Sequence, residues 1–219
     1  AFIGFAERLR KSLQPNDSNA IFLFFLESGY EFSGYLVSDK GNGNLEICGA
    51  VLINSSTAIT AAHCADDGTP IYLGLGQFSL DPESYYAVSS VQIHPEWVNN
   101  NPIHADLAVL TLADEVTLSQ YAVLSTAETN CNNTVVGYGK QDNSDNYIPL
   151  RKSADLCINS TDFSDGSISF VGSDGGLCFG DSGSPIFKSG TNEFVTIASR
   201  IDSCYTKNFG TGADLSEQL

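Results

Sequence analysis

Three residue types that cooperate in covalent catalysis occur in this chain in the order His63, Asp106 and Ser182. Ser182 lies in Gly180-Asp181-Ser182-Gly183-Ser184-Pro185, a turn-rich segment whose glycines allow a substrate to approach the backbone closely. A serine hydroxyl is a weak nucleophile until a base removes its proton, and a histidine titrates near neutrality. An acid beside the histidine fixes its tautomer and stabilises the imidazolium.

We therefore assign Ser182 as the nucleophile, His63 as the general base and then acid, and Asp106 as the residue that orients the histidine. The backbone N–H groups of Gly180 and Ser182 are assigned to an oxyanion hole, where losing one donor typically costs on the order of 10²–10³ in rate. A lone serine in a glycine turn is usually structural, so the assignment depends on the two upstream partners.

Many short strand-like segments separated by turn signals indicate an all-β chain. The two halves are similar, and ligand clefts favour domain interfaces, so we expect two β-barrels with the site between them. We expect one domain over 1–219, with a first barrel at about 20–115, a crossover at 116–130 and a second barrel at 131–212. The strands are expected at 21–26, 30–37, 45–54, 57–62, 71–75, 85–93, 107–112, 133–138, 148–158, 167–171, 185–187, 194–201 and 209–212.

Two further local patterns concern segments between and after these strands. The residues from Lys40 to Asn44 are expected to form an exposed hairpin tip. Asp214 and Glu217 have the spacing of a helix N-terminus, which predicts a short C-terminal helix. Only two residues follow Glu217, and so short a helix is marginal alone, so we expect the natural chain to continue beyond Leu219.

Composition limits the partners of the chain. Its 219 residues carry a formal net charge of −16, which disfavours nucleic acid and anionic membrane surfaces as partners. No run of 18 apolar residues exists, so no membrane span is expected. The chain starts with Ala1 and shows no signal peptide, and we therefore expect a mature or trimmed protein.

Cysteines and glycosylation sequons indicate a secreted, extracellular glycoprotein. Six cysteines are an even number, and no close Cys-x-x-Cys pair accompanies the three histidines, so no metal site is predicted. Four Asn-x-Ser/Thr sequons begin at Asn16, Asn54, Asn132 and Asn159.

Several segments resemble the chymotrypsin/trypsin-like serine protease family. They are Cys48 to Asn54, Thr60 to Cys64, Ile93 to Pro95, Asp106 to Leu110, Gly137 to Gly139 and Cys178 to Pro185, within a match from about Phe22 to Gly212. The family implies two antiparallel six-stranded barrels and hydrolysis of peptide bonds through an acyl-enzyme, without a cofactor. It also implies a monomer, made as a zymogen, that binds protein or peptide substrates and protein protease inhibitors.

The resemblance implies two of three disulfides. Cys48–Cys64 would tie the strand before His63 to the histidine turn, and Cys178–Cys204 would brace the walls of the substrate pocket. The remaining pair, Cys131–Cys157, is not taken from the family. The strands at 131–138 and 150–158 would form a hairpin that brings these cysteines to facing positions.

The resemblance also implies a substrate pocket. Gly176 at its floor has no carboxylate for a basic P1 side chain, and Asp174, two residues away, is a weaker alternative. Ile201 should narrow the mouth, as a branched residue does in elastases, which favours small or medium apolar P1 residues. Arg200 would either attract acidic substrate groups or face solvent, and Ser199 matches the family serine that supports the buried aspartate. The pocket residues are Gly176, Leu177, Ser199, Arg200, Ile201 and Gly210.

The N-terminus departs from the family, in which a newly formed α-ammonium pairs with the aspartate before the nucleophile, here Asp181. The usual Ile-Val-Gly-Gly is missing, and Ala1-Phe2-Ile3-Gly4 is a loose equivalent that makes Ala1 one candidate. Cleavage inside Arg8-Leu9-Arg10-Lys11, where counting back from Leu26 reaches Leu9, is a second possibility. A third possibility is that Asp181 has another partner or that the chain is an unactivated precursor. An uncompensated charge at Asp181 would be costly.

Two functions follow from these observations. The first is a secreted serine endopeptidase that cleaves after small or medium apolar residues. The alternative is a catalytically silent homologue that acts as a binding or regulatory protein. The intact His63, Asp106 and Ser182 favour the enzyme.

Overall fold

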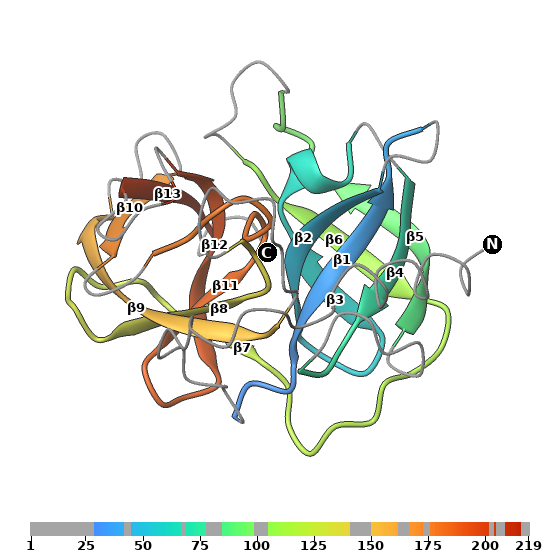
Figure 1. Cartoon of the computed structure of the whole chain (residues 1–219), viewed down its shortest axis with the longest axis horizontal. Coiled ribbons are helices and arrows are strands. Elements are labelled where there is room, and N and C mark those ends of the chain that lie inside the picture. The colour runs from blue at the N-terminus through green and yellow to red at the C-terminus, as the bar shows by residue number, and fades with distance from the viewer. Residues whose placement is uncertain are drawn as a thin grey trace, which may run out of the picture.

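The computed structural model describes residues 29–41, 45–66, 69–77, 85–98, 105–140, 150–161, 167–172, 176–201, 204 and 209–215. These ranges contain thirteen β-strands and one 3₁₀ turn, arranged as two barrels side by side (Figure 1). The predicted all-β architecture is therefore confirmed. Within the same ranges, no helix has the length and hydropathy of a transmembrane span.

The first barrel is a closed ring of six antiparallel strands in the order β1-β2-β3-β6-β5-β4. The 3₁₀ turn η1 (Ala62–Cys64) follows β3 and carries His63. The strands are β1 (Ser33–Asp39), β2 (Leu45–Leu52), β3 (Thr57–Thr60), β4 (Thr69–Gly74), β5 (Tyr85–Ile93) and β6 (Ala108–Leu112).

The second barrel has the strand order β11-β8-β9-β10-β13-β12, and a β11–β12 pairing closes this six-stranded ring. A further strand, β7 (Val123–Leu124), pairs in parallel with β12. The other strands are β8 (Asn133–Gly137), β9 (Lys152–Ser160), β10 (Ser167–Gly172), β11 (Pro185–Lys188), β12 (Glu193–Ile201) and β13 (Phe209–Asp214).

The observed strands follow the predicted segments closely, with two differences. β7 lies inside the stretch predicted as a crossover, because the backbone N–H groups of Val123 and Ser125 reach the carbonyls of Asn192 and Phe194, both at 2.9 Å. Asp214, where the predicted helix begins, is the last residue of β13, and its backbone pairs with that of Thr196. The predicted strand at 21–26 and the rest of the predicted helix, 216–219, lie outside the described residues.

All three predicted disulfides are present. Cys48–Cys64 joins β2 to η1, and Cys178–Cys204 joins two segments of the second barrel. Cys131 and Cys157 lie across the β8–β9 hairpin, where their Cα atoms are 3.8 Å apart. The hairpin therefore brings this third pair together as expected.

A shared apolar core joins the two barrels. The buried ring of Phe187 on β11 lies 4.7 Å from the ring of Tyr30 and 5.5 Å from that of Phe32, between centroids. Phe187 belongs to the same buried cluster as Leu52 and Leu110 of the first barrel. Aromatic rings bury large apolar areas, so this cluster is a main source of the free energy that holds the barrels together.

The Phe187→Ala substitution tests how much this shared core contributes to stability. We expect it to lower the free energy of unfolding by about 3–5 kcal/mol, because it leaves a cavity in the shared core. Urea denaturation followed by circular dichroism measures the change. Val123→Ala, at a side chain that is 54% exposed, should change stability by no more than about 0.5 kcal/mol. An equally small loss for Phe187→Ala would contradict the proposed contribution of this core.

Candidate active site

His63 sits in the middle of η1, and contacts from two strands fix the backbone of that turn. The Cys48–Cys64 disulfide ties the turn to β2. The Ser38 hydroxyl donates a hydrogen bond to the Cys64 carbonyl at 2.9 Å. The turn therefore cannot shift without disturbing β1 and β2.

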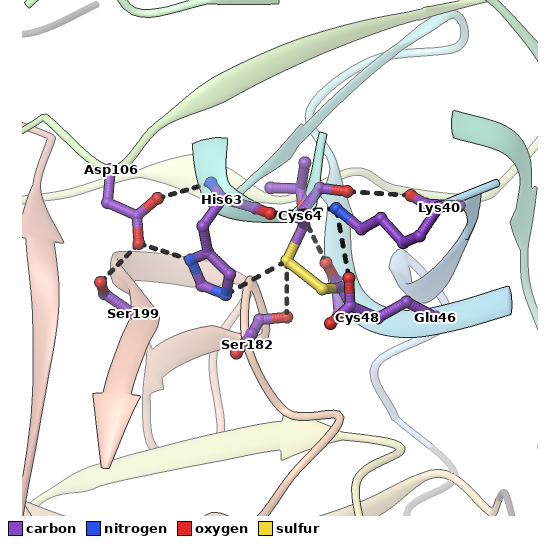
Figure 2. Close-up of a disulfide and its surroundings, with 11 residues drawn as sticks. Lys40, Glu46, Cys48, His63, Cys64, Asp106, Ser182 and Ser199 are labelled. Carbon is purple, nitrogen blue, oxygen red and sulfur yellow. Dashed lines mark hydrogen bonds and ion pairs between the residues drawn. A yellow bond between two sulfur atoms is a disulfide. The ribbon is translucent and has the colours of Figure 1, made fainter. Parts of the chain in front are cut away.

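Lys40 also supports this turn, which sequence reasoning did not predict. Its Nζ donates to the His63 carbonyl at 3.3 Å and lies 3.2 Å from Glu46 Oε2 (Figure 2). The Lys40 side chain is only 19% exposed. The expectation of an exposed tip therefore fails at Lys40, because its long side chain folds back against η1.

The backbone conformation before Asp106 and three hydrogen bonds together fix the position of its carboxylate. Asp106 follows Ala105, whose φ of 54° is unusual for a residue with a side chain and costs roughly 1–2 kcal/mol. The buried carboxylate accepts three hydrogen bonds. His63 donates through its backbone N–H to Oδ1 at 2.9 Å and through Nδ1 to Oδ2 at 2.8 Å, and Ser199 Oγ donates to Oδ2 at 2.5 Å.

These contacts determine the charge states around His63. Burial by itself raises the pKa of Asp106, but the hydrogen bonds and charge of His63, with the Ser199 hydroxyl, outweigh burial and bring the pKa below its usual 3.8. Asp106 is therefore ionised near neutrality and can only accept hydrogen bonds. Nδ1 of His63 must then carry a proton, so Nε2 of the neutral ring is available as a base.

Ser182 occupies a tight turn that bridges the barrels. Its carbonyl accepts a hydrogen bond from Gly49 N of β2 at 2.6 Å, and the next residue, Gly183, has φ 78°. A methyl group at Gly183 would overlap the Gly49 carbonyl and the Thr60 hydroxyl. Only glycine fits there, so the close approach of the two barrels fixes this part of the motif.

Two N–H groups of this turn are available to a ligand. Asp181 N donates to the Cys178 carbonyl at 3.1 Å, and Gly183 N donates to the Ala198 carbonyl at 2.7 Å. Within the described ranges, the N–H groups of Gly180 and Ser182 donate to no other residue. These are the two donors that the sequence assigned to an oxyanion hole.

His63 and Ser182 both lie beside the sulfur atom of Cys64. Nε2 of His63 lies 3.6 Å from Cys64 Sγ, and the Ser182 carbonyl oxygen lies 3.8 Å from the same sulfur (Figure 2). Among the described residues, no hydrogen bond joins the Ser182 hydroxyl to His63. Catalytic hydrogen bonds are often long without substrate and tighten when it binds.

A small cavity of about 20 Å³ opens beside Ser182, which is roughly the space of one water molecule. Four of the six predicted pocket residues line it, while Gly176, which the structure describes, does not. Gly210 lies in β13 opposite Ile201 of β12. The lining residues are Leu177, Cys178, Asp181, Ser182, Ala198, Ser199, Arg200 and Ile201.

Asp181 has partners within the second barrel. Its Oδ1 accepts a hydrogen bond from Gly139 N at 2.7 Å, and its Oδ2 accepts one from Cys178 N at 3.0 Å. Burial raises the pKa of Asp181 to about 6, although both hydrogen bonds and the charge of Lys152 oppose the rise. Ala1 lies outside the described residues, so its pairing with Asp181 stays a prediction.

Two residues of the nucleophile segment were not singled out from the sequence. Phe179, directly before Gly180, is 65% exposed, although it is aromatic. Ser184 is fully buried, and its hydroxyl hydrogen-bonds to no group in the described ranges. Phe179 could have been noted from the sequence alone, because it is an aromatic residue between Cys178 and Gly180. The burial of Ser184 could not, because it depends on the packing of the two barrels.

The structure also shows where the potential metal ligands and the predicted glycosylation sites lie. In the part of the chain that the structure describes, the one close group of potential ligands is Cys48, His63 and Cys64, and the disulfide leaves no thiolate there. Asn54, Asn132 and Asn159 are exposed, which suits their predicted glycosylation. Asn16 lies outside the described residues.

Comparison with known proteins adds sequence and fold relatives. The chain matches the profile of the family described as Trypsin over residues 28–216. It is 33% identical over 113 residues to chymotrypsin-like elastase family member 1 of Bos taurus, covering 46% of this chain and 42% of that protein. It is 31% identical over 174 residues to the Homo sapiens protein of that name, covering 67% of this chain and 66% of that protein.

The chain thus spans less than two thirds of the length of either relative. A solved structure of HL collagenase aligns with a TM-score of 0.69, covering 86% of this chain and 90% of that chain. The identity to it is 20%, so this likeness concerns the fold.

The Ser199→Ala substitution tests the hydrogen bond to Asp106. A lowered pKa in the folded protein means that ionised Asp106 stabilises the fold above its unfolded pKa, near 4, and that this gain is lost as pH falls through the folded pKa. Removing the donor should cost about 1.5–3 kcal/mol at pH 7 and less at pH 3. Urea denaturation at both pH values measures this.

A matched control is Ser90→Ala, at an exposed serine on β5, which should change stability little at either pH. A loss for Ser199→Ala that is the same at pH 3 and pH 7 would show that the hydrogen bond does not act on the charged carboxylate.

Proposed function

The chain belongs to the trypsin family of serine proteases, and from this premise we propose that it is a secreted serine endopeptidase. The observation that carries the proposal is the hydrogen-bonded pair of His63 and the buried Asp106 beside the Ser182 turn. In that turn, the N–H groups of Gly180 and Ser182 are engaged by no described residue. This combination of base, nucleophile and donors suits acyl transfer.

The reaction uses each group in turn. Ser182 Oγ attacks the peptide carbonyl while His63 Nε2 removes the hydroxyl proton, and ionised Asp106 stabilises the imidazolium. The N–H groups of Gly180 and Ser182 stabilise the oxyanion of the tetrahedral intermediate. His63 then donates its proton to the leaving amine, which leaves an acyl-enzyme on Ser182. A water molecule, deprotonated by His63, hydrolyses the acyl-enzyme and restores the serine.

Substrates are proteins or peptides with a small or medium apolar P1 residue. The cavity of about 20 Å³ beside Ser182 and the branched side chain of Ile201 at its wall support this preference. Arg200 is exposed and lies near the same cavity, where it would attract acidic substrate groups. The relatives named as elastases agree with this substrate class.

The remaining properties follow the family resemblance. Three disulfides are typical of an oxidising compartment, which supports secretion. The exposed sequons support a glycoprotein. We propose that the protein acts as a monomer, and that protein protease inhibitors bind the same cleft as substrates.

The alternative is a catalytically silent homologue that binds partners without cleaving them. The observation that favours it is the missing hydrogen bond between the Ser182 hydroxyl and His63 among the described residues. If the histidine cannot reach the serine, the hydroxyl stays a weak nucleophile.

Labelling with an organophosphonate that reacts only with an activated serine distinguishes the two functions. We expect the folded wild-type protein to be labelled at Ser182, as located by peptide mapping. The Ser182→Ala variant should not be labelled. The His63→Ala variant should be labelled at least about 10²-fold more slowly, because the general base is lost. A folded wild-type protein that stays unlabelled would be a silent homologue.

The Ile201→Gly substitution tests the P1 preference. Opening the pocket wall should raise kcat/KM for a large aromatic P1 residue, relative to alanine, by roughly tenfold or more, because each added methylene can contribute about 1–3 kcal/mol of discrimination. A peptide library with varied P1 residues measures the profile. Arg200→Ala, at the exposed neighbour, should leave the size preference unchanged. An unaltered profile for Ile201→Gly would contradict the pocket assignment.

A further inference from the structure

The Asp181 carboxylate is enclosed by backbone from two segments. Gly139 N and Cys178 N each donate a hydrogen bond to it. A methyl group at Gly137 or Gly139 would overlap the carboxylate, so it lies directly against both glycines. The two donors are neutral dipoles, and a buried carboxylate usually needs a positive charge nearby as well.

The strand pairing brings one such charge to this position. Lys152, the first residue of β9, is directly opposite Gly137 of β8 in the antiparallel register. Opposed residues point to the same face of a sheet, with Cβ positions about 4.5–5.5 Å apart. The side of Gly137 that faces Asp181 is therefore the side on which Lys152 projects. Gly137 has no side chain, so it leaves the path of the lysine open.

The surroundings of Lys152 agree with a charge directed inward. Its Nζ is buried, although lysine ammonium groups are rarely taken out of water unless a carboxylate is near. Among the described residues, Lys152 is the charged side chain that acts on the Asp181 carboxylate. The neighbouring Arg151, directly before β9, instead hydrogen-bonds to the Tyr138 hydroxyl.

We propose that Lys152 is the buried counter-charge of Asp181 and that it positions the turn from Cys178 to Ser182. Asp181 directly precedes Ser182, and its carboxylate receives Cys178 N–H, so holding the carboxylate also holds the peptides between these residues. Those peptides include the N–H groups of Gly180 and Ser182. Lys152 is thus a positioning residue, and the turn keeps its shape without a free amino group at Ala1. The catalytic consequence rests on the proposed function.

The first experiment removes the charge of Lys152 while keeping a side chain of similar length. In Lys152→Met, kcat on a peptide with alanine at P1 should fall on the order of 10²-fold, as expected for a misplaced oxyanion donor, while KM changes by less than about threefold. Lys152→Arg should recover most of the lost rate. Lys188→Met removes a partly exposed lysine that pairs with Glu193 on the same barrel, and it should leave kcat unchanged.

The second experiment does not depend on activity. Titration of the Asp181 carboxyl carbon by NMR should show a pKa near 6 in the wild type and a value higher by about 1 or more in Lys152→Met. An unchanged pKa, or a kcat of Lys152→Met equal to that of the wild type, would overturn the proposal.

A third arm extends the chain before Ala1. We expect wild-type protein with a short peptide attached to the Ala1 nitrogen to be labelled at Ser182 as fast as the unextended protein. Loss of labelling on extension would show that Asp181 depends on a terminal ammonium and would overturn the proposal. A different result, in which the pKa of Asp181 rises in Lys152→Met but no form is labelled, would support the counter-charge and reject the protease function.

Discussion

The buried carboxylate of Asp106 is the constraint on which the candidate site depends. Its three hydrogen-bond donors come from both barrels, because His63 belongs to η1 of the first barrel and Ser199 belongs to β12 of the second. A carboxylate without these donors would be too costly to bury. The charge of Asp106 can therefore be buried only when the barrels are docked, and docking is what the shared core around Phe187 stabilises.

The two aspartates of the site have opposite environments. Asp106 interacts with an imidazole and a hydroxyl, which lower its pKa more than burial raises it. Asp181 interacts with two backbone N–H groups and a lysine, and burial dominates, so its pKa rises to about 6. Carboxylates with pKa values pushed in opposite directions commonly have different functions in one site. Here Asp106 contacts the imidazole of His63, and Asp181 contacts the turn that contains Ser182.

The sequence was most informative where local pattern alone determines structure. Strand-like segments and turn signals predicted nearly all strands, and the motifs around His63, Asp106 and Ser182 indicated residues that the structure brings together. Features set by long-range packing were missed. β7 forms because two residues lie beside β12, and Lys40 folds back onto η1 instead of remaining at an exposed tip. The position of Lys152 follows from the β8–β9 register, which cannot be read from its neighbours in the chain.

The same register explains why an internal lysine differs physically from a terminal ammonium as a partner of Asp181. A terminal ammonium must be released by cleavage and then ordered, which costs conformational entropy for every residue of the segment that carries it. Lys152 is fixed in β9 as soon as the β8–β9 hairpin forms, and the Cys131–Cys157 disulfide closes that hairpin. Its remaining cost is the rotamer freedom of one side chain and the desolvation of one charge, which the carboxylate offsets. A turn held in this way would form together with the barrel that contains it.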